Sequence, residues 1–185
     1  MRFLLFLPLV ISLIGCNTVY RPWLKSTYQM SAPVQLDVVS VDVNNLYVNQ
    51  TREPNVETQV DPTPDLQIIS WVQNYMRAAG ESGRAIVTIE EASLVKDIAR
   101  NSSADRPNSM YIMTIELKIE VLDRRGGSRG YTRVRGQRSH ELPDNFTNTE
   151  KQEAWRIMLE ELFGGLEISI RNNISNNIPS VIRTS

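Results

Sequence analysis

The sequence predicts an α+β domain in which two amphipathic helices pack on one face of a four-stranded sheet, either mixed or antiparallel. Two patterns support this prediction. Four segments alternate between apolar and polar residues, the period of a strand. Two other segments repeat apolar residues every three or four positions, which is typical of a helix with one buried face. The predicted order is β-α-β-β-β-α.

The first strand is predicted within residues 33–48, which are rich in β-branched side chains. Its apolar residues form two sets, one on each face, with a bulge between them: Val34, Leu36 and Val38, then Val39, Val41 and Val43. A long connection follows. Its three prolines, Pro54, Pro62 and Pro64, exclude a regular helix there. Connections of this length often carry function.

The first helix is predicted over about 16 residues from Pro64. Thr63 suits the N-cap position and Pro64 the first helical position. Gly80 is expected just beyond the C-terminus of the helix, where a left-handed residue commonly ends the last turn.

Three strands are predicted next, over residues 84–98, 110–123 and 131–142. The middle one has the clearest pattern, with these apolar side chains on one face: Tyr111, Met113, Ile115, Leu117, Ile119 and Val121. The residues between them are mostly polar or charged. This contrast between the two faces predicts a sheet that is covered on one side only.

The last helix is predicted to run about 28 residues to Asn177, with Pro179 after its end. Thr147 and Glu150 have the spacing of a capping box, in which each side chain bonds the backbone N–H of the other residue. Gly164 and Gly165 interrupt the pattern, and we expect either a bend or a close approach to the sheet there.

The chain begins MRFLLFLPLVISLIGC, a positive residue and then an uncharged run from residue 3 to 14. As a helix this run rises about 18 Å, too short for a hydrocarbon core of about 30 Å, so it predicts a secretory signal. The tetrapeptide Leu13-Ile14-Gly15-Cys16 resembles the lipobox of bacterial lipoproteins. This resemblance implies cleavage before Cys16, a diacylglyceryl group on its sulfur and an acyl chain such as palmitate on its amine.

Three regions follow from this assignment. We expect residues 1–15 to be a signal peptide that is removed, residues 16–33 to be a lipidated N-terminus and tether, and residues 34–185 to form a single α+β domain facing the periplasm. Tyr20 and Trp23 of the tether either lie at the lipid interface or dock on the domain. Asn17 stands where an inner-membrane lipoprotein of enteric bacteria often has aspartate, which favours the outer membrane over the inner membrane.

Composition argues against several classes of function. The net charge of −1 shows no bias towards nucleic acid. One histidine and one cysteine make a zinc site improbable, and no cofactor is expected besides the lipid on Cys16. Ser139 and Glu141 flank His140 on a strand and therefore point away from its side of the sheet. We therefore expect no catalytic residues and no enzyme activity.

Arginines gather around the last predicted turn and strand. Four of them are candidate contacts for an anionic ligand or a partner: Arg129, Arg133, Arg135 and Arg138. Guanidinium groups bind phosphate and carboxylate with two parallel hydrogen bonds, which suits anionic lipid, lipopolysaccharide or an acidic protein. The alternative is a charged edge that prevents pairing between sheets.

The element order behind a lipobox resembles two groups of envelope lipoproteins, the auxiliary lipoproteins of ABC-type transport systems and the lipopolysaccharide-assembly lipoprotein. The segment Asp61–Glu91 also resembles uncharacterised alphaproteobacterial lipoproteins, with a proline-rich entry, a tryptophan-containing helix and a glycine-rich turn. These resemblances imply a non-enzymatic accessory protein of an envelope transport or assembly complex. A lipid or small-molecule carrier with a cleft between helix and sheet is the alternative.

Overall fold

A computed structural model describes residues 26–99, 103 and 107–182 of the chain. The signal peptide, Cys16 and the part of the tether up to residue 25 lie outside these described residues, as do Asn17, Tyr20 and Trp23. None of the helices in the described ranges is long and apolar enough to cross a membrane.

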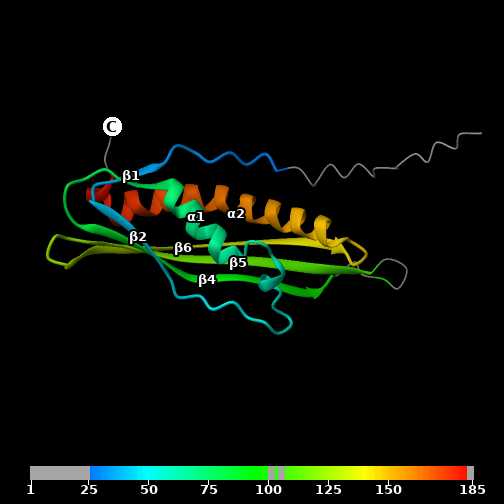
Figure 1. Cartoon of the computed structure of the whole chain (residues 1–185). Helices are drawn as coiled ribbons and strands as arrows, with labels where there is room; N and C mark the ends of the chain where they lie inside the picture. Colours follow the sequence, from blue (N-terminus) through cyan, green and yellow to red (C-terminus); the bar gives the residue numbers. More distant parts are fainter. Residues whose placement is uncertain (1–25, 100–102, 104–106, 183–185) are drawn as a thin grey trace, which may run out of the picture.

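The main sheet contains the four strands β2 (Ser40–Asn45), β4 (Arg84–Ile98), β5 (Asn108–Leu122) and β6 (Ser128–Pro143), in the order β2-β4-β5-β6. β2 runs parallel to β4, and the other neighbours are antiparallel. Two helices, α1 (Pro64–Tyr75) and α2 (Asn148–Asn177), cover the same face of this sheet (Figure 1). The predicted α+β class, with a four-stranded mixed sheet and two helices, is confirmed.

A second, two-stranded sheet corrects two predicted boundaries. The first strand is not continuous: it forms β1 (Val34–Leu36), bends at residues 37–39 and resumes as β2. The first helix ends at Tyr75, about one turn earlier than predicted, because the chain extends into β3 (Met76–Ala78), which pairs in parallel with β1. This long-range pairing replaces the last helical turn.

Gly80 therefore has a role other than ending a helix. Its N–H donates to the Val38 carbonyl at 3.0 Å, so its backbone lies directly against the bend after β1. A Cβ atom on Gly80 would lie 2.5 Å from the Asp37 carbonyl carbon, closer than any side chain tolerates. The absence of a side chain permits this backbone contact.

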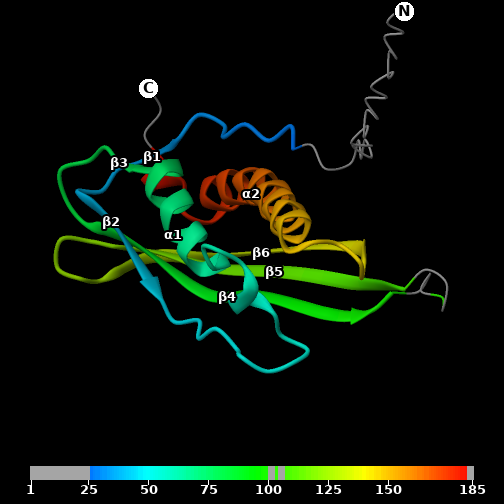
Figure 2. The same cartoon turned by 45° about the vertical axis from the view of Figure 1, so that its right-hand side comes forward.

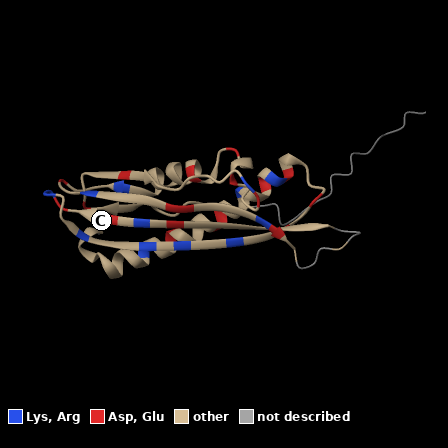
Figure 3. Cartoon of the chain, turned by 90° about the horizontal axis from the view of Figure 1, so that it is seen from below, with Lys and Arg blue, Asp and Glu red and all other residues tan. Residues whose placement is uncertain are grey.

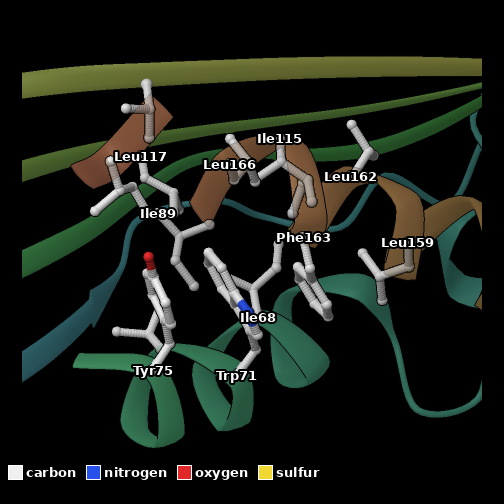
Figure 4. Packing of buried hydrophobic residues seen from close by; sticks show 14 of the residues in the cluster. Ile68, Trp71, Tyr75, Ile89, Ile115, Leu117, Leu159, Leu162, Phe163 and Leu166 are labelled. Carbon is white, nitrogen blue, oxygen red and sulfur yellow. The ribbon is translucent and has the colours of Figure 1, made fainter. Parts of the chain in front are cut away.

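The core lies between the main sheet and the helices (Figure 4). All six predicted inward side chains of β5 are buried, and they pack against apolar residues of α1 and α2. Ile68 comes from α1, and Leu159, Leu162 and Leu166 come from α2 (Figure 4). The alternation of apolar and polar residues along this strand therefore identified correctly which face of the sheet is buried.

α2 begins with the predicted capping box. Glu150 N–H donates to Thr147 Oγ1 at 3.3 Å, and Thr147 N–H donates to Glu150 Oε2 at 2.9 Å. The helix continues through Gly164 and Gly165 without interruption. A Cβ on Gly164 would lie 3.7 Å from the Tyr28 ring, an ordinary van der Waals distance, and a Cβ on Gly165 would have no neighbour within 4 Å, so the expected close approach to the sheet is not found at these two glycines.

The proline-rich connection packs along the edge of β4. Leu46 N–H donates to the Ile89 carbonyl at 3.1 Å, and Val56 N–H donates to the Leu94 carbonyl at 2.8 Å. A short 3₁₀ helix, η1 (Glu57–Gln59), completes this segment. The connection thus covers the part of β4 that extends beyond β2, whereas β6 ends the sheet on its other side.

Candidate functional site

Residues 26–33, which we name the strap, lie on the outer side of the helices. The strap runs along α2 and leads into β1, with the helices between it and the main sheet (Figures 1 and 2). Arg171 of α2 donates from Nη2 to the Ala32 carbonyl at 2.7 Å. The described part of the predicted tether is therefore bound to the domain.

Glu167 of α2 is the centre of this attachment. It is only 4% exposed. Its Oε1 accepts from the Tyr28 hydroxyl at 2.5 Å, and its Oε2 accepts from Ser31 N–H at 3.0 Å. Trp71 Nε1 of α1 also donates to Oε1, at 3.3 Å. One carboxylate thus joins the strap to both helices.

Hydrogen bonding determines the ionisation of this carboxylate. Burial opposes the charged form of Glu167, but the hydrogen bonds from Tyr28, Ser31 and Trp71 outweigh it and hold its pKa below the usual value. Burial, together with the bond to the Glu167 carboxylate, raises the pKa of the Tyr28 hydroxyl. At neutral pH the pair is therefore an ionised carboxylate and a neutral phenol.

Aromatic rings surround Glu167. The Trp71 ring stacks on Phe163 with centroids 4.5 Å apart and on Tyr75 with centroids 5.5 Å apart. Beside these rings the strap, α1 and α2 border an open, mainly apolar hollow of about 610 Å³. Leu66 contributes to it and is 55% exposed. This hollow lies between the helices and the strap, whereas the helix–sheet interface, where the carrier hypothesis expected a cleft, holds the packed core.

The four candidate arginines do not meet at one place. Arg133 and Arg135 lie on the sheet face away from the helices, which we name the outer face. Arg138 points to the helix side, where its Nε lies 3.7 Å from Glu161 Oε2 of α2. Arg129 donates from Nη2 to the Ser180 carbonyl at 3.1 Å. Only Arg133 and Arg135 are therefore brought together.

Each of these two arginines has carboxylate partners on the inner strands. Arg133 Nε lies 2.8 Å from Glu90 Oε2. Arg135 lies 3.1 Å from Glu91 Oε2 and 3.0 Å from Glu116 Oε2. The arginine side chains remain 50% and 58% exposed, whereas these glutamates are less than 30% exposed. An anionic partner would therefore meet the guanidinium groups first.

Further charges continue this pattern along the outer face. Lys118 Nζ bonds Glu120 Oε2 at 2.8 Å, and the Tyr131 ring lies 5.4 Å from Lys118 Nζ and 5.6 Å from Arg133 Cζ. Seen from below, basic and acidic bands occur along the long strands (Figure 3). The outer face thus presents a ladder of paired charges with an exposed tyrosine ring.

His140 lies on the helix side of β6. Its Nε2 is 3.4 Å from Glu161 Oε2. Within the described ranges, no group of three or more histidine, cysteine, aspartate or glutamate side chains is placed to hold a metal ion.

Sequence reasoning missed Glu167 and Tyr28. Glu167 follows Phe163 by four positions and precedes Ile170 by three, so it lies on the buried side of α2. A carboxylate at such a position requires buried donors. That spacing was the available signal, although it could not identify Tyr28 as the donor.

No protein-family model and no curated protein matches the chain. Among solved structures, it is similar to a minor lipoprotein from Acinetobacter baumannii, with 13% identity and a TM-score of 0.40 over 79% of this chain and 96% of the other. It is also similar to the rare lipoprotein B from Shewanella oneidensis, with 9% identity and a TM-score of 0.37 over 74% of this chain and 98% of the other. An uncharacterised lipoprotein B from Nitrosomonas europaea has 12% identity and a TM-score of 0.36 over 76% and 87%. These three are bacterial lipoproteins by name, and at such scores the α+β class rests on the sheet order described above.

Proposed function

We propose that the chain is a lipid-anchored protein of the bacterial cell envelope that faces the periplasm and serves as a non-enzymatic docking component of a transport or assembly complex. Leu13-Ile14-Gly15-Cys16 supports the anchor. Two or three acyl chains on Cys16 would hold the chain stably at a membrane, since each buried CH₂ contributes about 0.8 kcal/mol. Asn17 favours the outer membrane over the inner one.

The attachment of the strap by Glu167 is the observation that carries this proposal. Cys16 lies ten residues before Ser26, where the described strap begins. Because the strap is bound on the outer side of the helices, the described chain begins on the helix side of the domain, and we expect the anchor on that side (Figure 2). The outer face of the sheet is then directed away from the membrane, towards a partner.

The chemistry of the outer face supports docking rather than catalysis. Its charges are paired with one another, and His140, the only histidine, lies on the opposite side of the sheet beside Glu161. Exposed charge pairs of this kind contribute little to stability but affect the choice of partner. Arg133 and Arg135 remain the residues that we expect to contact an acidic protein or an anionic lipid.

Replacing Arg133 and Arg135 together with glutamate tests this function. We expect recovery of envelope partners from cross-linked membranes to fall at least about tenfold, since like charges in an interface cost several kcal/mol. The measurement is quantitative mass spectrometry of proteins captured with the lipid-anchored chain as bait.

The matched control is Arg124→Glu with Arg125→Glu, the same charge change in the exposed turn before β6. Its recovery should equal that of the wild type. Equal recovery from all three baits would show that the outer face is not the docking surface.

A further inference from the structure

We propose that the free edge of β6 binds an extended, acidic segment of a partner protein as a fifth strand. This inference rests on the proposed docking function and specifies how the partner is held. β6 is 16 residues long and pairs along one side with β5. It is the last strand of the sheet order, so within the described chain no strand pairs with its other side.

Two observations show which backbone groups of β6 point away from β5, towards the free edge of the sheet. Asn173 of α2 donates from Nδ2 to the Arg133 carbonyl at 3.1 Å, so this carbonyl points away from β5 and is already bonded by α2. The pattern of hydrogen bonds between β4, β5 and β6 also indicates that Arg133 points away from β5. The Ile89 carbonyl accepts from Leu46 N–H and thus points away from β5, so Leu117, which lies opposite Ile89 in β5, must form its hydrogen bonds with Val134 of β6.

In an antiparallel pair, residues whose backbone groups bond the neighbouring strand alternate with residues whose backbone groups point away from it. The N–H and C=O groups of Arg135, Gln137 and Ser139 therefore also point away from β5. The register is regular from Tyr131 to Pro143, so the alternation holds over this stretch. These are the groups with which an added strand would form main-chain hydrogen bonds.

The edge has a hollow for side chains of the added strand. α2 approaches β6 closely at Gly136, where a Cβ would lie 3.0 Å from Leu162 Cδ2. Gly165 of α2 lies on the other side of this space, and a Cβ atom added to it would have no neighbouring atom within 4 Å. A hollow of about 190 Å³ lies here, with Leu162, Leu166 and Ser169 among its lining residues. Small or apolar side chains of a fifth strand would enter it at every second position.

The remaining side chains of a fifth strand would lie beside Arg133 and Arg135. These arginines are on the edge strand, while their glutamate partners are on the inner strands β4 and β5. Carboxylates at alternate positions would therefore complement the edge. A second copy of this chain would place its own arginines against them, and like charges directly opposite destabilise strand pairing.

The probe is a fluorescein-labelled peptide of alternating valine and aspartate, and its binding to the full chain in detergent micelles is measured by fluorescence anisotropy. We expect the peptide to bind, and the same peptide with lysine in place of aspartate to bind at least about tenfold more weakly. Failure of the aspartate peptide to bind, or equal binding of both peptides, would overturn the proposal.

Gln137→Pro separates the edge from the rest of the surface. Proline removes an outward N–H without removing a bond to β5, so the fold should tolerate it. We expect peptide affinity to fall about tenfold, whereas the control Gln137→Thr keeps the N–H and should bind as the wild type does. Equal affinity of the two variants would contradict the fifth-strand geometry.

Gly165→Leu tests the hollow independently. The substitution should raise the melting temperature, since glycine is a poor helix residue, yet weaken peptide binding by filling the hollow. Unchanged binding would exclude the hollow. If Gln137→Pro leaves partner capture intact while Arg133→Glu with Arg135→Glu abolishes it, the docking function stands and the edge proposal fails.

Discussion

Replacing Glu167 with alanine is expected to lower the free energy of unfolding by about 3 kcal/mol, since it removes a charged acceptor that three donors share. Ser31 N–H would lose this acceptor, Trp71 Nε1 would keep only the Tyr28 hydroxyl oxygen at 3.2 Å, and the Tyr28 hydroxyl would have to donate to water. The strap should detach from α2. Urea denaturation measures the stability, and hydrogen exchange at Ser31 reports the detachment.

Glu167→Gln is the matched control, because it keeps the shape and one acceptor oxygen but not the charge. We expect a smaller loss, about 1–2 kcal/mol. A loss below about 0.5 kcal/mol for the alanine variant, the range of ordinary surface substitutions, would contradict the role of Glu167.

The same pair of proteins predicts a pH dependence. The pKa of Glu167 is lowered in the folded chain, so its ionised form stabilises the fold fully above the ordinary value of 4.5. This contribution is lost as the pH falls through the lower pKa of the folded state. The stability advantage of the wild type over Glu167→Gln should therefore shrink below pH 4.5. A constant difference down to acidic pH would show that hydrogen bonds do not favour the ionised carboxylate.

Trp155→Ala is expected to have the largest effect on the core, about 4 kcal/mol of unfolding free energy, because it removes a large buried ring. Trp155 is 1% exposed and lies 5.6 Å from the Tyr111 ring, so it joins α2 to β5. Calorimetry or denaturant unfolding measures this loss.

Trp155→Phe separates the ring from its N–H group. Within the described residues, Trp155 Nε1 has no hydrogen-bond partner. Phenylalanine therefore removes an unsatisfied donor while keeping an aromatic ring, and we expect a loss of less than about 2 kcal/mol. Equal losses for the two variants would contradict the packing described for this ring.

The long strands and the second helix were predictable because their signals are local. In β5 every second residue is apolar, and this alternation reflects one face against the helices and one against solvent. The start of α2 was equally clear, since Thr147 and Glu150 satisfy each other within one turn.

The region around β1 and β3 was not predictable in the same way. Met76 and Ala79 continue an apolar helical pattern, and only the pairing of Met76–Ala78 with Val34–Leu36 draws this segment into a strand. Gly80 resembles a helix terminus in the sequence, whereas its function is a close contact with Asp37. Tertiary contacts overrode local preference at these positions.

The candidate site was predictable in part. Alternation along β6 correctly placed Arg133 and Arg135 on one face. The strand register, which the sequence does not encode locally, supplied Glu90, Glu91 and Glu116 as their partners. Glu167 was missed because its partners lie in the strap and in α1, far from it in the chain.

The orientation of the anchored domain tests the central claim most directly. Cys16 is the only cysteine, so once it is acylated a single introduced cysteine can carry a fluorophore. Leu66→Cys on the helix side and Tyr131→Cys on the outer face are matched, because the native residues are 55% and 54% exposed. With the lipidated chain in vesicles containing brominated lipid, we predict stronger quenching at residue 66 than at residue 131, and loss of this difference in Glu167→Ala. Equal quenching at the two positions in the otherwise native chain, or stronger quenching at residue 131, would contradict an outer face directed away from the membrane.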